Sequence, residues 1–143
     1  MRPATFRNRA YVGTGSGVLA LAMARLGVKR IVALDNDPQA LDNARHDAQL
    51  NGCAGAIRFS AAPLRTLRRT FALITANILS SVLIAMAPEL TRLLAPGGRL
   101  ILSGILAREA EDVMRHYRPA MRRMWSRTER GWTTLILGSR QQA

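Results

Sequence analysis

The sequence predicts an α/β fold, a doubly wound and mostly parallel sheet that closes with an antiparallel hairpin. Two patterns lead to this prediction: short apolar runs alternate with helix-like segments, and the chain finishes in two strand-like runs around one tight turn. Strands buried on both faces and joined by helices form a parallel sheet covered on both sides. No repeat or internal boundary interrupts the rhythm, so we expect a single domain over residues 1–143.

The first strand ends at residues 10–13 and leads into a glycine-rich turn. Residues 18–26 then place apolar side chains all round a helix, and Gly27 suits its C-terminal end. Residues 30–34 include the run IVAL, which is typical of a strand buried on both faces.

A second helix begins after the sequence DNDP. Asp37 is a favoured N-cap residue, and Pro38 suits the first helical position. The helix should extend to about residue 50, where an Asn-Gly pair stops it. Residues 56–60 form a weaker strand.

The second half of the chain repeats this alternation. Residues 71–76 (FALITA) form a strand, and residues 80–94 a helix that Pro88 should kink or split. A turn at 95–98 (APGG) precedes another buried strand at 99–103.

The chain closes with a helix and a hairpin. The helix covers residues 109–117, and the hairpin strands cover 122–129 and 132–138. The pair Arg130–Gly131 forms the turn between them.

The composition is that of a globular protein of the cytoplasm. Hydrophobic residues make up 48% of the 143 residues, and no apolar run is long enough to span a membrane. The opening MRPATFRNR lacks the apolar core of a signal peptide. Cys53 is the only cysteine, which excludes an internal disulfide or a cysteine-rich metal site. We therefore expect neither a metal nor a membrane partner.

The net charge of +12 comes almost entirely from arginine, with 21 basic residues against 9 acidic ones. Two interpretations stay open. The arginines attract RNA or the ribosome, or they only fill the solvated face of the protein. The densest run lies at residues 115–130 and has too few aromatic residues for a base-stacking platform.

The stretch AYVGTGSG carries the first candidate ligand site. Gly13, Gly15 and Gly17 follow a strand, where glycine permits positive φ and leaves no Cβ between the backbone and a ligand. A dinucleotide fingerprint needs its third glycine at position 18, which is Val18, so a pyrophosphate site is disfavoured.

Two polar residues follow later strands. Asp35 comes about 20 residues after the glycine loop, where a carboxylate accepts hydrogen bonds from both hydroxyls of a ribose. Asp37 already caps the next helix, which leaves Asp35 for a ligand. Asn77 ends the strand FALITA, and its amide either orients a substrate amine or only forms a turn. All three sites follow strands, so they should line one edge of the sheet.

The sequence resembles the catalytic domain of the PrmA family of class I, Rossmann-like methyltransferases. VGTGSGVLALAMARLG, IVALDNDPQALDNARHDAQLNG, ANIL, APELTRLLAPGGRLILSGIL and GWTTLIL carry the resemblance, in order, from about residue 10 to residue 138. The glycine loop and DNDP are shared by many class I methyltransferases, whereas ANIL together with LAPGGRLILSGIL is particular to PrmA-like proteins.

This resemblance implies an S-adenosylmethionine-dependent enzyme that methylates amino groups of a ribosomal protein. Asp35 would hold the ribose hydroxyls of the cofactor, Asn36 would lie beside its adenosine, and Asn77 would face the target amine. In-line transfer to a neutral nitrogen requires alignment more than a strong base. The residues implied to line the methionine and ribose part are Gly13, Thr14, Gly15 and Gly17.

The chain departs from the family at Tyr11, where the family has an acid that helps to fix the methionine end of the cofactor. Its loss should cost about 1–3 kcal/mol of binding, the range for a charge-assisted hydrogen bond. The family's separate N-terminal substrate-recognition domain is also missing from this sequence. The surface that it would cover predicts a homodimer.

Three other functions are alternatives. A degenerate, non-catalytic methyltransferase fold is favoured by Tyr11 and the missing region. An RNA methyltransferase is favoured by the net charge, although Ile78 and Leu79 follow the asparagine where such enzymes often have prolines and an aromatic residue. An oxidoreductase is disfavoured by Val18.

Overall fold

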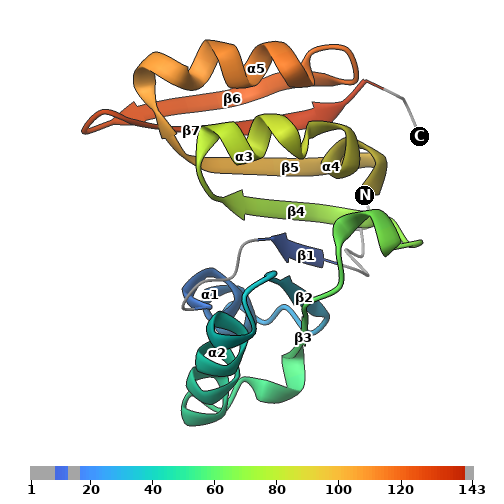
Figure 1. Ribbon diagram of the computed structural model, residues 1–143, viewed down its shortest axis with the longest axis vertical. Coiled ribbons are helices and arrows are strands. Elements are labelled where there is room, and N and C mark those ends of the chain that lie inside the picture. The colour runs from blue at the N-terminus through green and yellow to red at the C-terminus, as the bar shows by residue number, and fades with distance from the viewer. Residues whose placement is uncertain (1–8, 13–16, 141–143) are drawn as a thin grey trace. The chain divides into compact units, whose positions relative to one another are not determined.

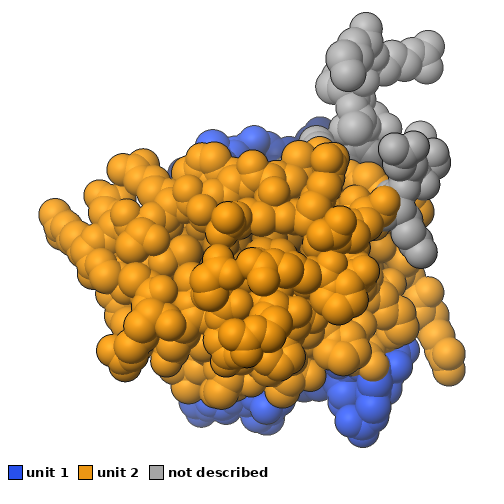
Figure 2. Space-filling view, turned by 90° about the horizontal axis from the view of Figure 1, so that it is seen from above, with its two compact units in different colours: residues 1–67 blue, residues 68–143 orange. Residues whose placement is uncertain are grey.

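The computed structural model describes residues 9–12 and 17–140. Their contacts divide the chain into two compact units, Met1–Leu67 and Arg68–Ala143 (Figure 2). Each unit contains its own strands and its own helices, so each unit has α/β structure (Figure 1).

The first unit contains a three-stranded parallel sheet in which β2 pairs with both β1 and β3. Its strands are β1 (Arg9–Val12), β2 (Ile31–Leu34) and β3 (Ile57–Ser60). Its helices are α1 (Val18–Arg25) and α2 (Pro38–Leu50), with short 3₁₀ turns at η1 (Ala54–Ala56) and η2 (Leu64–Thr66). The parallel strand–helix alternation expected for this half of the chain is confirmed.

Helix boundaries in this unit follow from local chemistry. Asp37 is the N-cap of α2, where its Oδ1 accepts a hydrogen bond from the N–H of Gln39 at 2.9 Å, and Pro38 is the first helical residue. Gly27 ends the turn after α1 with φ +89°, a conformation that costs glycine little.

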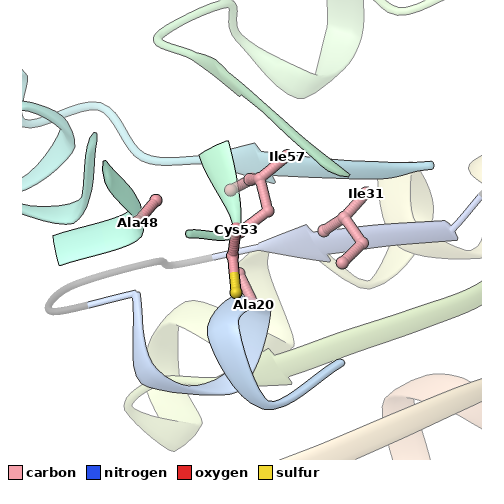
Figure 3. Close-up of a cluster of buried hydrophobic side chains, with 6 residues drawn as sticks. Ala20, Ile31, Ala48, Cys53 and Ile57 are labelled. Carbon is pink, nitrogen blue, oxygen red and sulfur yellow. The ribbon is translucent and has the colours of Figure 1, made fainter. Parts of the chain in front are cut away.

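Small side chains form the core between α1, α2 and the sheet (Figure 3). The labelled residues come from both helices, from β2, from β3 and from the turn before η1: Ala20, Ile31, Ala48, Cys53 and Ile57. Alanine at the contact lets a helix lie close to the strands. Although α1 is apolar all round, it buries only Ala20 fully.

The second unit contains four strands in the order β4-β5-β7-β6. Its strands are β4 (Phe71–Asn77), β5 (Leu94–Leu106), β6 (Met121–Glu129) and β7 (Trp132–Ser139). Its helices are α3 (Ser80–Ala85), α4 (Ala87–Leu93) and α5 (Ala110–Tyr117), with a 3₁₀ turn η3 (Ala107–Glu109) before α5. The pair β4–β5 is parallel, whereas β7 runs antiparallel to β5 and to β6.

Two predictions around proline and glycine have different outcomes. The predicted split at Pro88 is confirmed, because α3 ends at Ala85 and α4 begins at Ala87. The predicted turn at 95–98 is instead an irregularity inside β5. Phe71 pairs with Leu94 and Leu73 with Arg99, so residues 95–98 bulge out of the ladder.

The C-terminal hairpin is confirmed. Arg130 (φ 51°) and Gly131 (φ 81°) form the two-residue connection between β6 and β7. Two positive φ values match the twist of the strands that such a turn joins.

Large side chains fill the second unit, and Tyr117 is the largest of those that are fully buried. Its hydroxyl donates a hydrogen bond to the carbonyl oxygen of Leu83 at 2.6 Å, which joins α5 to α3. Burial raises the pKa of Tyr117 above its ordinary value.

In the part of the chain that the structure describes, no helix is long and apolar enough to cross a membrane.

Candidate cofactor and catalytic site

Asp35 follows directly after β2 and is oriented by local hydrogen bonds. Its N–H donates to the carbonyl oxygen of Ser60 at 3.3 Å, and its Oδ1 accepts from the N–H of Asp37 at 3.0 Å. The side chain is half-buried, whereas Asn36 beside it is exposed. The carboxylate is therefore held at the carboxyl end of the sheet with a defined direction.

This geometry confirms the expected N-cap and adds a local contact of the second acid. Asp37 does cap α2, as expected. Asp35 also has a local role, because its Oδ1 accepts the hydrogen bond from the N–H of Asp37 in a tight turn. Its role toward a ligand stays a prediction. The Asp35 carboxylate fits a cofactor ribose in its chemistry, because the ribose hydroxyl groups donate hydrogen bonds and carboxylate oxygens accept them.

Gly17 is buried and has φ +76°. A Cβ placed on it would lie 3.0 Å from the Cβ of Ala44, so the residue lets the start of α1 approach α2 closely. This close approach gives Gly17 a packing role that the glycine spacing did not reveal. Gly13, Thr14 and Gly15 lie outside the described residues.

Asn77 is the last residue of β4 and is exposed. Its register partner on β5 is Ser103, and α3 begins three residues later at Ser80. The Ser80 hydroxyl donates to Oε2 of Glu109 at 2.7 Å, which ties the start of α3 to η3. This hydrogen bond joins residues far apart in the sequence, so no spacing pattern indicates it.

The candidate residues divide between the two units. Gly17, Asp35 and Asn36 belong to the first unit, and Asn77 belongs to the second. Tyr11 lies within β1, where its backbone pairs with Ala33. The sequence predicts that these residues line one common edge of the sheet, and because they belong to different units this stays a prediction.

No group of three or more metal-ligating side chains occurs among residues 9–12 and 17–140.

Most arginines of the run at residues 115–130 are engaged in ion pairs. Glu111 accepts from Arg118 at 2.6 Å and from Arg123 at 3.3 Å, and these arginines lower the pKa of Glu111. Arg115 pairs with Asp112, and Arg127 with Glu129. All of these groups are exposed, so each pair contributes little to stability.

The order of strands and helices is that of the class I methyltransferase fold. The structure resembles the ribosomal protein L11 methylase from Lactobacillus delbrueckii subsp. bulgaricus with a TM-score of 0.87 and 29% identity, over 95% of this chain and 72% of that chain. It also resembles an RNA methyltransferase from Salinibacter ruber in complex with S-adenosyl-L-homocysteine. There the TM-score is 0.77 at 22% identity, over 95% of this chain and 83% of that one, which shows the fold alone.

The family model for ribosomal protein L11 methyltransferase (PrmA) matches residues 6–140, and the chain belongs to this family. It is 48% identical to the ribosomal protein L11 methyltransferase of Pelobacter propionicus over 104 residues, which are 73% of this chain and 33% of that protein. It is 47% identical to the protein of that name from Sorangium cellulosum over 106 residues, 74% of this chain and 33% of the relative. The chain thus spans about a third of the length of these relatives.

Proposed function

We propose that the chain is the methyl-transferring domain of an S-adenosylmethionine-dependent protein N-methyltransferase that acts on a ribosomal protein, in the cytoplasm. The match of residues 6–140 to the L11 methyltransferase family carries this proposal. Relatives of this chain bear the name ribosomal protein L11 methyltransferase, so an amino group of L11 is the first substrate to test.

Asp35 and the glycine loop would hold the cofactor. The oriented carboxylate of Asp35 would accept from the ribose hydroxyls, and the exposed Asn36 would lie beside the adenosine. When bound, S-adenosylmethionine supplies a methyl group activated by its sulfonium. The loop residues proposed to contact it are Gly13, Thr14, Gly15 and Gly17.

Asn77 would orient the target amine. Its amide oxygen accepts a hydrogen bond from an N–H of a neutral amine, which directs the nitrogen lone pair along the line of transfer. An amide has no charge to gain or lose, so this role needs a fixed side-chain direction and not a tuned pKa.

Calorimetric titration with S-adenosylmethionine and transfer of a radiolabelled methyl group to purified L11 test the proposal together. We expect saturable heat and label on L11 in the presence of the chain. Saturable binding without label on L11 or on whole ribosomes would contradict transfer by this chain. The absence of heat at millimolar cofactor would contradict the cofactor site.

Tyr11 favours one competing function, a non-catalytic protein that keeps the fold. Replacing it by the family's acid in Tyr11→Asp should tighten cofactor binding by about tenfold or more, as a regained charge-assisted hydrogen bond predicts. The competing function fails if the wild type and the variant both bind S-adenosylmethionine tightly.

Ribosome association through arginines is a separate part of the proposal. The net charge of +12 supports it, whereas the ion pairs of the run at 115–130 support the solvated-face interpretation. Co-sedimentation with ribosomes that weakens steeply with salt supports association. Sedimentation that does not respond to salt contradicts it.

A further inference from the structure

Gly104 lies in a bulge of β5. In the pairing of β5 with β7, Leu102 stands opposite Leu135 and Ile105 stands opposite Thr133. The two residues between them on β5, Ser103 and Gly104, therefore face a single residue of β7. The backbone of Gly104 has φ +78°, a conformation that L side chains rarely adopt.

The side chain of Asn77 occupies the space beside Gly104. A Cβ added to Gly104 would lie 2.6 Å from Oδ1 of Asn77 and 3.1 Å from the carbonyl oxygen of Ile78. A carbon and an oxygen in ordinary contact are more than 3 Å apart, so any side chain here would displace the Asn77 amide.

The register explains why these two residues meet. Asn77 pairs with Ser103 across the parallel β4–β5 ladder, so Gly104 comes one residue after the partner of Asn77. The bulge on β5 thus lies beside the carboxyl end of β4. Bulges next to functional sites commonly redirect a side chain.

We propose that Gly104 is a positioning residue for Asn77: its missing side chain and left-handed backbone set where the Asn77 carboxamide can lie. The consequence for methyl transfer rests on the proposed function, in which Asn77 orients the amine. The placement of the carboxamide itself does not depend on that function.

Gly97 provides a matched control on the same strand. It also has positive φ, +73°, but a Cβ added to it would meet no atom within 4 Å. Gly97→Ala therefore introduces the same kind of backbone strain without displacing Asn77. The difference between Gly104→Ala and Gly97→Ala therefore reports the crowding of the Asn77 carboxamide together with the weaker contact to the Ile78 backbone, and removing the carboxamide in Asn77→Ala separates the two.

The first test observes the Asn77 side chain directly. In ¹⁵N–¹H correlation spectra of the full chain, its NH₂ pair is assigned by its loss in Asn77→Ala. We expect this pair to shift in Gly104→Ala and to stay in place in Gly97→Ala. An unmoved pair in Gly104→Ala would overturn the proposal, as would an equal shift in both variants.

The second test is a double-mutant cycle on the midpoint of thermal unfolding. Gly104→Ala should lower the midpoint more in the wild type than in Asn77→Ala, where the displaced oxygen is already gone. Equal losses in the two backgrounds would contradict the proposal. If Gly104→Ala alone does not fold, the double variant should regain folding, and a double variant that stays unfolded would also contradict it.

The third test separates positioning from the proposed function. In the transfer assay, Gly104→Ala should lower kcat at least tenfold with the KM for S-adenosylmethionine changed less than twofold, while Gly97→Ala keeps kcat within about threefold. A kcat that falls equally in both variants would contradict positioning. Wild-type chain without transfer would refute the proposed function, and the amide shift and the cycle would still decide the role of Gly104.

Discussion

The two units of this chain differ in how they fill their interiors. The cluster between α1, α2 and the first sheet consists largely of small side chains such as Ala20, Ala48 and Cys53. The second unit buries large ones, among them Leu102 and Tyr117. Because burial stabilises roughly in proportion to apolar area, the second unit should resist local opening more strongly.

The proposed chemistry is divided in the same way. Asp35, the proposed cofactor residue, belongs to the first unit, and Asn77, the proposed substrate residue, belongs to the second. A ligand stabilises the region whose folded state its binding requires. We therefore expect the cofactor to act mainly on the stability of the first unit, and variants in the second unit to act on turnover or on global stability.

The largest effect should come from truncating the core of the second unit. Leu102 is fully buried in β5, beside Leu135 of β7. Leu102→Ala should reduce the free energy of unfolding by about 3–4 kcal/mol, measured by urea denaturation, because it leaves a cavity. Leu50→Ala removes a leucine that is 72% exposed and should change it by less than about 0.5 kcal/mol. Similar losses in the two variants would contradict the assignment of the core.

Asn77→Ala should separate turnover from binding. We expect kcat to fall about a hundredfold, equivalent to about 2.7 kcal/mol, because the amine loses its orientation. The dissociation constant for S-adenosylmethionine should stay within about threefold. Asn43→Ala, which changes an exposed asparagine of α2, serves as the control. Undiminished turnover in Asn77→Ala would show that the asparagine has been given the wrong role.

Asp35→Ala should have the opposite pattern. Loss of a carboxylate that accepts from ribose hydroxyls should weaken cofactor binding by about tenfold or more, as calorimetry would measure. Asp42→Ala makes the same change of charge on the exposed face of α2 and should leave binding unchanged. Equal weakening in both variants would point to a general charge effect.

The smallest effect concerns Tyr117. Tyr117→Phe should cost about 1 kcal/mol, because the carbonyl oxygen of Leu83 loses its donor. Burial raises the pKa of Tyr117, so the folded state favours the neutral phenol. The stability that the buried neutral phenol contributes is fully present below the pKa of tyrosine in the unfolded chain, about 10. It is lost as the pH rises above that value. Alkaline unfolding curves should show that loss in the wild type and less of it in Tyr117→Phe.

Local signals in the sequence predicted most of the elements. Asp37 before Pro38 fixed the start of α2, Pro88 predicted the split between α3 and α4, and Arg130–Gly131 predicted the hairpin turn. Each of these signals acts through the backbone of its own few residues, so neighbouring residues were enough to predict it.

Features that depend on pairing with distant residues were missed. The run at 95–98 looks like a turn by itself and becomes a bulge only because β4 pairs on both sides of it. Gly17 and Gly104 have roles set by Ala44 and Asn77, which are far from them in the sequence. The hydrogen bond from Asp37 to Asp35 is local, but two acids near one helix start gave no indication of which atoms would bond.

Hydrogen–deuterium exchange with and without S-adenosylmethionine tests most directly the claim that the first unit binds the cofactor. The amides of β2 and of the turn before α2, residues 31–37, should become protected in the wild type at saturating cofactor, and much less so in Asp35→Ala at the same concentration. The amides of α5 and of the β6–β7 hairpin should change little. Protection confined to the second unit, or no protection at millimolar cofactor, would contradict the account.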